Sequence, residues 1–325
     1  MLRRALLACF LAACSRQPPA APPSNEVRFT GMCDASGAVP LDEHTFLVAD
    51  DEDNVLRVYD ATQGGEPLVA VDLSDALQLP RKKNKGAPEI DIEAATRVGS
   101  LAYFVTSHGR NSSGKPKPER LRFFATTASA NGKPELVGKP YDALLKDLLA
   151  EPRLAGFGLA AAAELAPKAP GGLNIEGMTA RREGGVWLGF RNPLPAGRAL
   201  LVPLLNPEQL IEGQAARFGE PLTLDLGGLG VRALSSAGGK YLIAAGPFDS
   251  GPAARLFTWR GGDAAAPVSG VDVSGYNPEG FFSHGASARV LMLSDDGSVR
   301  IGDKECKKLT SPEEKQFRGL WVAIP

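Results

Sequence analysis

The sequence predicts an all-β domain, and more specifically a β-propeller. Short runs of about five residues, rich in Val, Leu, Phe, Tyr and Trp, alternate along the chain with turns that contain Gly, Pro, Asn and Asp. A charged residue followed by a small residue recurs along the chain. Most of the intervals between these pairs are roughly 40–60 residues long, which is the length of a propeller blade. After each of the first five pairs comes a turn, a strand, a turn and another strand.

Six such pairs occur, and they set the expected number of blades. They are Asp34-Ala35, Glu93-Ala94, Glu176-Gly177, Arg232-Ala233, Glu279-Gly280 and Arg318-Gly319. No chain remains after the last pair to build the other strands of a blade, so we expect five complete blades and a C-terminal strand that helps to close the ring. A six-bladed ring is the alternative if the N- and C-terminal segments share a blade. A β-sandwich would have no reason to repeat the pair.

One stretch departs from the strand pattern. Residues 141–149 and 158–165 have the composition and spacing of helices, which predicts a short helical insertion over about 141–166. This insertion accounts for the long interval between the second and third pairs. The propeller domain is therefore expected to span residues 26–325.

The N-terminus predicts export. Two arginines precede a short apolar run over residues 5–13, which is too short to span a membrane and matches the apolar region of a signal peptide. The run ends in Leu-Ala-Ala-Cys, and small residues before a cysteine are typical of lipoprotein cleavage sites. We therefore expect a signal peptide over 1–13 and a lipid anchor at Cys14, with an ordinary signal peptide and a chance cysteine as the alternative. Ser15, in place of Asp, favours the outer membrane facing the periplasm.

The next segment and the overall charge restrict the partners. Residues 14–25 are rich in Pro and Ala and are expected to form an extended tether. The net charge is -1, with 36 basic and 37 acidic residues, which argues against nucleic acid and against a polybasic membrane surface. The expected contact with the membrane is therefore the lipid anchor.

Cysteine usage agrees with an exported protein. Cys9 leaves with the signal peptide and Cys14 is acylated, so Cys33 and Cys306 remain near the two ends of the domain. Closure of the ring would bring these ends together, and the periplasm is oxidising. We expect a disulfide between them, and two buried free thiols are the alternative.

The blade pattern also predicts where a functional site would lie. The first strand of a blade starts, and the second strand ends, on the same face of a propeller near its axis. The residues at the starts of the first strands, which should lie on that face, are Asp34, Glu93, Glu176, Arg232, Glu279 and Arg318. The ends of the second strands add Asp50, Asp51, Asp53, His108, Arg110, Arg191, Asp249, Asp295 and Asp296. Charged residues from every blade should therefore surround the mouth of the axial channel.

Two interpretations of this ring concern its arginines. Glu and Arg side chains that pair between blades would lock the ring, because an unpaired buried charge is unfavourable. Unpaired arginines would instead bind the phosphate or carboxylate group of a small anionic ligand. The candidates for this second role are Arg110, Arg191, Arg232 and Arg318.

A third interpretation is a metal site. Ca²⁺ takes about six to eight oxygen ligands, and Asp50, Asp51 and Asp53 are the local candidates, although such a run is more often a solvated turn. No other cofactor is indicated, since the sequence contains no nucleophile elbow, zincin helix, Walker A motif or dinucleotide fingerprint. Of the three histidines, His108 alone is expected on the charged face, where it could act as an acid or base beside Arg110.

Several segments also carry a family resemblance. They are GMCDASG over 31–37, VADDEDNVLRVY over 48–59, LNIEGM over 173–178, LGFRNPL over 188–194 and RALLVPL over 198–204. These segments resemble an uncharacterised bacterial family of predicted propellers and, more distantly, the phytase-like (esterase-like) propellers. The resemblance implies a propeller fold, and it implies no activity because none is established for the close family.

Two hypotheses about function follow. The first is a binding or scaffold propeller on a lipid-anchored chain, which contacts a small ligand or another envelope protein. The second is a Ca²⁺-assisted phosphoester or ester hydrolase of the phytase-like kind. The hydrolase would need acidic residues with open Ca²⁺ coordination that face arginines, so it loses support if the acids are consumed by arginine pairs.

Replacement of Cys14 tests export and anchoring. Cys14→Ala removes the thiol that is acylated, so the chain should leave the membrane fraction or stay unprocessed. Membrane fractionation and mass spectrometry measure both outcomes. Cys9→Ala changes a residue of the segment that is removed, so this control should behave as the wild type. Normal fractionation and a normal cleaved mass in the Cys14 variant would contradict the prediction.

Overall fold

The computed structural model describes residues 25–81, 86–129, 132–249, 254–262, 264–284, 287 and 289–324. The expected signal peptide over 1–13, the acylation site Cys14 and residues 14–24 of the tether lie outside these ranges. Within them, every helix is too short or too polar to cross a membrane.

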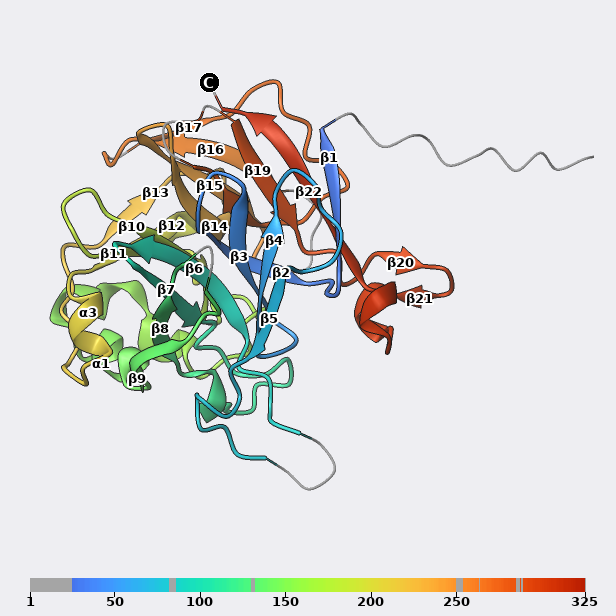
Figure 1. Cartoon of the computed structure of the whole chain (residues 1–325). Helices are drawn as coiled ribbons and strands as arrows, with labels where there is room; N and C mark the ends of the chain where they lie inside the picture. The colour runs from blue at the N-terminus through green and yellow to red at the C-terminus, as the bar shows by residue number, and fades with distance from the viewer. Residues whose placement is uncertain are drawn as a thin grey trace, which may run out of the picture.

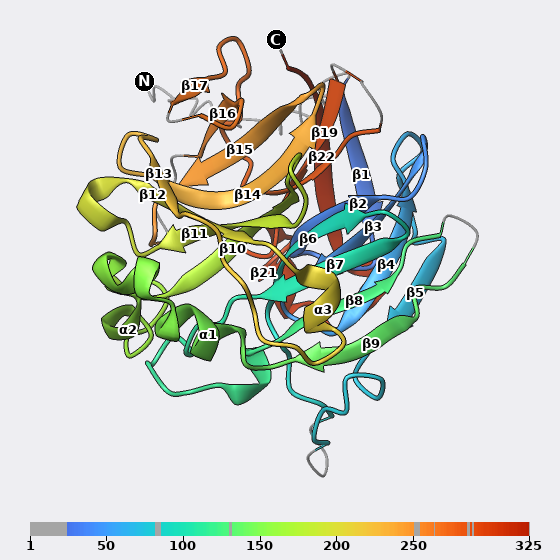
Figure 2. The same ribbon diagram turned by 90° about the vertical axis from the view of Figure 1, so that its left-hand side faces the viewer.

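Five four-stranded antiparallel sheets form the five blades of a propeller (Figures 1 and 2). Blade 1 contains β2 (Ala35–Pro40), β3 (Thr45–Asp50), β4 (Val55–Asp60) and β5 (Val69–Asp72). Blade 2 contains β6 (Ile92–Val98), β7 (Leu101–Thr106), β8 (Phe123–Thr127) and β9 (Leu136–Tyr141). Blade 3 contains β10 (Asn174–Ala180), β11 (Val186–Asn192), β12 (Ala199–Leu204) and β13 (Leu222–Leu224). Blade 4 contains β14 (Gly230–Ala237), β15 (Lys240–Gly246), β16 (Arg255–Trp259) and β17 (Ala265–Pro267).

Blade 5 combines the two ends of the domain. It contains β18 (Pro278–Phe282), β19 (Arg289–Ser294), β22 (Gln316–Ala323) and β1 (Glu26–Thr30). A small hairpin of β20 (Arg300–Ile301) and β21 (Lys304–Glu305) precedes β22. The innermost strands β2, β6, β10, β14 and β18 contact one another in this order, and β18 contacts β2. The ring is therefore closed, and the predicted five-bladed propeller is confirmed.

The C-terminal strand does not start a new blade. Arg318 lies in β22, the third strand of blade 5, opposite Arg28 of β1. The prediction that Arg318 begins an inner strand is therefore wrong. The charged–small pair at Arg318 does not mark an inner strand, since the pairing of β22 with β1 and β19 decides the place of the strand.

Each inner strand carries a β-bulge at one repeated position. The pairing with the second strand skips one residue in every blade, and these residues are Gly37, Glu93, Glu176, Arg232 and Glu279. A bulge adds one unpaired residue and changes the direction of its side chain. The repeated charged position is thus a bulge position. In blade 1 this position holds a glycine, so Asp34, which lies three residues earlier, is not equivalent to the other four residues.

The residue at or after the bulge is small because the inner strands crowd the axis. A Cβ atom on Gly37 would lie 2.7 Å from the backbone nitrogen of Ala95 in the next blade. A Cβ atom on Gly177 would lie 2.6 Å from a methyl group of Val231. Both distances are too short for a real contact, so larger residues would push neighbouring blades apart.

Helices lie mainly between blades 2 and 3. The predicted insertion contains α1 (Leu144–Ala150), the 3₁₀ helix η2 (Pro152–Phe157) and α2 (Leu159–Ala162). Leu144 and Leu148 are four residues apart, lie on one face of α1 and are buried against the two blades. Elsewhere α3 (Pro207–Leu210) precedes β13, and the remaining 3₁₀ turns are η1 (Pro118–Arg120), η3 (Pro195–Gly197), η4 (Cys306–Lys308) and η5 (Pro312–Glu314).

Aromatic side chains fasten the N-terminal strand to the ring. Phe29 of β1 stacks on Phe317 with 4.8 Å between ring centroids, and its edge meets Phe46 of blade 1 at 5.4 Å. All three rings are fully buried. Each such pair contributes roughly 0.5–1.5 kcal/mol beyond the burial of its area. The joint between blades 5 and 1 therefore has its own hydrophobic core.

A disulfide joins the same two blades. Cys33 precedes β2 of blade 1, Cys306 follows the hairpin of blade 5, and their sulfur atoms are bonded across 273 residues of sequence. The Cα atoms are 5.9 Å apart and both residues are buried. The bridge closes almost the whole domain into one covalent loop.

Removal of both cysteines should lower the stability of the ring. The double variant Cys33→Ser and Cys306→Ser gains chain entropy in its unfolded state, so the free energy of unfolding should fall by about 2–5 kcal/mol. Denaturant titration measures the change. A reducing agent should weaken the wild type and leave the double variant unaffected. Equal midpoints for the oxidised wild type and the variant would contradict the prediction.

Candidate functional site

A cavity of about 630 Å³ opens on the face where the inner strands begin. Its wall receives side chains from all five blades. Blades 1 and 2 contribute Asp34, Asp51, Glu52, Asp91, Glu93 and Arg120. Blades 3, 4 and 5 contribute Asn174, Glu176, Arg191, Arg232, Glu279 and Asp295. The described wall is completed by Asn111, Ser112, Lys307 and residues 166–169, which follow the helical insertion.

The cavity ends blindly along the axis. Below the ring of bulge residues, the space between the inner strands shrinks to about 10 Å³, bounded by small residues such as Ala38, Ala94 and Gly280. A space of this size holds about one water molecule at most. A ligand would therefore enter and leave on the charged face alone.

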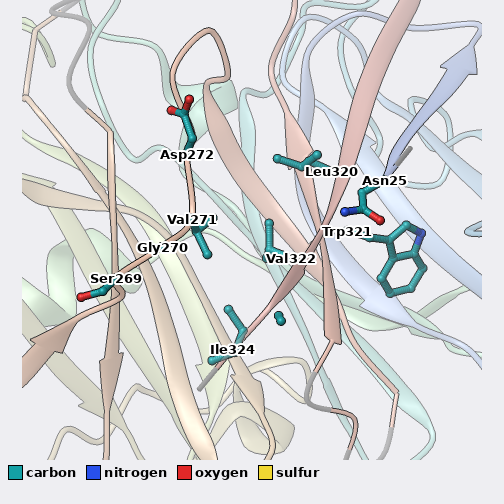
Figure 3. A pocket seen from close by; sticks show the side chains of 10 residues that line it. Asn25, Ser269, Gly270, Val271, Asp272, Leu320, Trp321, Val322 and Ile324 are labelled. Carbon is teal, nitrogen blue, oxygen red and sulfur yellow. The ribbon is translucent and has the colours of Figure 1, made fainter. Parts of the chain in front are cut away.

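A second hollow on the outer surface has different chemistry. It measures about 440 Å³ and lies between blades 4 and 5, where Val271, Leu320, Val322 and Ile324 line it (Figure 3). Asp272 is the one ionisable residue of its wall, and none of the residues expected at a site from the sequence lies there. The charged residues of the blade pattern, such as Glu93, Glu176 and Arg232, line the axial cavity instead.

The structure brings together most of the residues that the blade pattern assigned to one face. Asp34, Glu93, Glu176, Arg191, Arg232 and Glu279 line the axial cavity. The residues of the pattern that lie outside its wall are Asp50, Asp53, Asp249, Asp296, Arg110, Arg318 and His108. Arg110 turns outward and pairs with Glu164 of the helical insertion. Arg318 pairs with Asp296 at 2.7 Å on the third strand of blade 5.

His108, by contrast, is sealed inside the protein. It is 2% exposed, its backbone φ angle is 55°, and its Nδ1 atom lies 2.8 Å from the carbonyl oxygen of Thr106. Burial lowers the pKa of His108 to about 4, so the ring is neutral at physiological pH. It is outside the wall of the cavity, where among the described residues no histidine and no cysteine is found.

The cavity is also lined by Asp91, Asn174, Arg120 and Lys307, which the sequence pattern did not single out. Asp91 and Asn174 lie two residues before the bulges of blades 2 and 3. This constant offset was a usable signal, because both positions precede the same structural feature. Arg120 and Lys307 come from loops outside the repeat, and no sequence signal identifies them.

The arginines of the cavity are engaged. Arg191 points its Nη1 atom at Glu176 over 2.7 Å, and its other nitrogens donate to the carbonyl oxygens of Pro247 at 2.8 Å and Asp249 at 2.7 Å. Arg232 donates to Glu279, and its Nε atom lies 4.0 Å from Glu176. These contacts link blades 3, 4 and 5. On this side of the cavity, the arginine pairs therefore agree with the interpretation that Glu and Arg side chains hold neighbouring blades together.

A similar pairing occurs in blade 2. Arg120 contacts Asp91 at 2.8 Å and also pairs with Glu89. Burial nevertheless raises the pKa of Asp91 to about 6 against the opposing effect of Arg120. The basic side chain thus balances only part of the negative charge on this wall.

The acidic side of the cavity lies on blade 1 and is not balanced by arginines. Asp34, Asp50 and Asp51 each offer an oxygen atom, and the three atoms lie within 4.8 Å of one another. Burial, followed by the nearby carboxyl groups of Asp295 and Asp50, raises the pKa of Asp34 to about 9. Burial, followed by the effect of Asp53, raises the pKa of Asp50 to about 7.

Asp53 is not part of this cluster. It forms a two-pronged pair with Arg57, with the shorter contact at 2.7 Å, and also accepts a hydrogen bond from the backbone of Val55. Of the three metal-site candidates in the sequence, the structure therefore groups Asp50 and Asp51 and replaces Asp53 by Asp34.

Glu93 is a buried carboxylate of the site that has no direct partner in the described part of the chain. Its side chain is 8% exposed, and among the described residues it has neither a hydrogen-bond partner nor an ion-pair partner. Burial and then the neighbouring Glu176 raise its pKa well above the usual range. A buried carboxylate without a partner is unfavourable unless a proton or a bound cation compensates it. The cavity is thus preorganised to attract positive charge.

Comparisons with known proteins agree on the general class. A family described as a protein of unknown function (DUF3616) matches residues 125–271. The match supports an uncharacterised family of propellers and attaches no activity to the chain. No protein of curated function matches the sequence.

Solved structures show only distant likeness. Glutaminyl cyclase from Myxococcus xanthus is 11% identical, with a TM-score of 0.47, 92% of this chain covered and 95% of that chain. The PQQ-bound aldose sugar dehydrogenase from Streptomyces coelicolor is 12% identical, with a TM-score of 0.42, 93% of this chain covered and 100% of that one. At these values neither protein informs the activity of this chain.

Arg191→Ala tests the lock on the arginine side. The substitution strands Glu176 in a buried position, so the free energy of unfolding should fall by about 3–5 kcal/mol. Denaturant titration measures the loss. Arg300 is exposed and outside the cavity, and Arg300→Ala should change stability by less than about 0.5 kcal/mol. A similarly small effect of Arg191→Ala would show that the pair is not a lock.

His108 predicts a pH dependence of stability. The unfolded chain binds a proton at this residue near pH 6.5, whereas the folded chain binds it near pH 4. As the pH falls, the unfolded state therefore gains this proton before the folded state does. The free energy of unfolding should decrease by up to roughly 3 kcal/mol between these two pH values. His108→Asn, which tolerates the positive φ angle, should flatten the curve of unfolding free energy between these pH values. His44→Asn, at an exposed histidine, is the control, and parallel curves for wild type and His108→Asn would refute the prediction.

Proposed function

We propose that this chain is an exported, lipid-anchored binding propeller and that its axial cavity binds a small, positively charged ligand. The observation that carries the proposal is the buried carboxylate of Glu93, which has no partner among the described residues and faces a cavity rich in further carboxyl groups. Such a group lowers the stability of the empty protein. A buried residue that lowers stability is expected where ligand binding, and not packing, is the reason for its presence.

The charge balance of the wall supports a cationic ligand. Eight carboxyl side chains and five basic side chains line the cavity. Of the basic groups, Arg120, Arg191 and Arg232 are paired with carboxylates, and Lys307 contacts Glu52 at 3.0 Å. The fifth, Lys168, is exposed and forms no ion pair in the described part of the chain, so it is the one basic group that would receive an anion without the loss of an existing pair. This balance of charge departs from the anionic ligand that the arginine positions suggested in the sequence.

The anchor would hold the cavity near a membrane surface. Residues 14–25 at about 3.1 Å per residue would span at most roughly 40 Å. In the proposed arrangement the protein faces the periplasm from the outer membrane and samples ligands within this distance of the lipid. The support for the anchor is the signal sequence and Cys14, while the cavity supports the binding role independently.

A Ca²⁺-assisted hydrolase is the second candidate, favoured by the cluster of Asp34, Asp50 and Asp51. The engaged arginines weigh against it, because they are unavailable to hold a phosphoryl group. Ser112 is the only hydroxyl side chain on the described wall of the cavity. Release of nitrophenol from p-nitrophenyl phosphate or acetate in the presence of CaCl₂ would support this candidate over a binding role.

Calorimetry and thermal shifts test the binding role. The purified chain, treated with a chelator, is titrated with spermidine, lysine and glucosamine, and in parallel with phosphate and citrate. At least one amine should bind and raise the melting temperature, since an ammonium group replaces the missing partner of the acidic wall. Stabilisation by the anions alone would contradict the proposal.

Glu93→Gln separates binding from stability. Loss of one charge-assisted interaction of about 1.5–3 kcal/mol should weaken amine binding by roughly 10–100-fold. The empty variant should be as stable as the wild type or more stable, because the change removes an uncompensated buried charge. Glu220→Gln removes an exposed carboxylate outside the cavity and is the matched control. Unchanged amine affinity in Glu93→Gln would show that this residue does not contact the ligand.

A further inference from the structure

We infer that Asp34, Asp50 and Asp51 bind a Ca²⁺ ion on the wall of the axial cavity, at the joint between blades 1 and 5. The organic ligand proposed above is not needed for this site. The inference adds a second ligand and a second role, because an ion at this position would tie together the two ends of the ring.

The distances between the three carboxyl groups suit one ion. One oxygen from each residue lies within 4.8 Å of the other two. Ca²⁺ binds oxygen at about 2.3–2.6 Å, so two ligands of one ion are separated by at most about 5 Å. The three oxygens therefore need little movement to share an ion, and the open side of the cavity leaves room for water as further ligands.

Unpartnered carboxyl oxygens next to the cluster are an independent indication. The Oδ1 atom of Asp51 is shielded from solvent and has no hydrogen-bond partner among the described residues. Glu93, which is 8% exposed and likewise unpartnered, lines the same cavity. Asp51 and Glu93 thus bring carboxyl groups from blades 1 and 2 to one cavity wall. Such an arrangement is more favourable with a cation between the carboxylates.

The nearby basic groups do not neutralise the cluster. Arg57 is held by Asp53 at 2.7 Å, and Lys307 is held by Glu52 at 3.0 Å. Neither of them forms an ion pair with Asp34, Asp50 or Asp51 in the described part of the chain. No ion pair with a basic side chain of the described residues therefore compensates the cluster directly, whereas a bound cation would.

The fold explains why these residues meet at this joint. Asp50 ends β3 and pairs with Ala35 at the start of β2, which places Asp34 and Asp51 side by side. Asp34 forms a backbone bridge with Asp295, which follows β19 of blade 5. The neighbouring Cys33 is bonded to Cys306, and its carbonyl oxygen accepts a hydrogen bond of 2.9 Å from Asp296. The cluster is thus held by covalent and backbone contacts from both blades.

The donor set favours Ca²⁺ over other metals. All three ligands are carboxylate oxygens, and the group contains neither histidine nor thiolate, which zinc and copper prefer. Mg²⁺ demands near-octahedral geometry and keeps most of its water, whereas Ca²⁺ accepts irregular sets of oxygens from separate segments. We therefore expect Mg²⁺ to bind more weakly.

The test uses the full-length purified chain after removal of metals with a chelator. Calorimetric titration with CaCl₂ should show one site with a dissociation constant below roughly 1 mM, the upper range of extracellular Ca²⁺ modules. The melting temperature should rise with the logarithm of the Ca²⁺ concentration, and MgCl₂ should produce a smaller rise at the same concentration. Absence of heat and of a thermal shift, or an equal response to Mg²⁺, would overturn the assignment.

Two variants locate the site. Asp51→Asn and Asp34→Asn should each weaken Ca²⁺ binding at least about tenfold while the metal-free protein melts no lower than the wild type, since each removes a repelling charge. Asp272→Asn changes an exposed aspartate on another blade and should bind Ca²⁺ as the wild type. Full Ca²⁺ binding in either cavity variant would place the ion elsewhere. Amine binding in the presence of chelator, with no response to Ca²⁺, would overturn this inference and leave the proposed function intact.

Discussion

The convergence of five inner strands on one axis is the constraint on which the rest of the structure depends. Where two inner strands approach most closely there is room only for a small residue, as the approach of Gly37 to Ala95 shows. A bulge occurs in every inner strand, and in blades 2 to 5 the bulge residue is a charged side chain that lines the mouth of the channel. The packing of the inner strands and the position of the charged site therefore both follow from the same local geometry.

The mouth of the channel is divided into two halves, which differ in whether their carboxyl groups are paired with basic side chains. On blades 3 to 5, Arg191 and Arg232 are balanced by Glu176 and Glu279, and the contacts run between blades. On blades 1 and 2 the carboxyl groups exceed their basic partners, and Glu93 has none among the described residues. The paired half stabilises the ring, whereas the unpaired half reduces its stability and creates an attraction for positive charge.

The joint between blades 1 and 5 concentrates several independent constraints. The first strand of the chain pairs with the last, Phe29 stacks on Phe317, and the disulfide binds Cys33 to Cys306. The acidic cluster sits beside this joint, next to Cys33. A ligand bound at this joint in the folded state would stabilise the whole ring, because it binds the folded chain and not the unfolded one.

The sequence by itself determined the strand-rich class, the five repeats, the helical insertion and the gathering of Glu93, Glu176, Arg232 and Glu279, because periodic patterns report which residues occupy equivalent places. It placed Arg318 and Arg110 wrongly, since a charged residue before a small one carries no information about its strand partner or its ion-pair partner. Only the tertiary structure decided that Asp34 joins Asp50 and Asp51 and that the arginines are already engaged. Pairing and bulges set the direction of each side chain, and these depend on contacts between segments that are far apart in the chain.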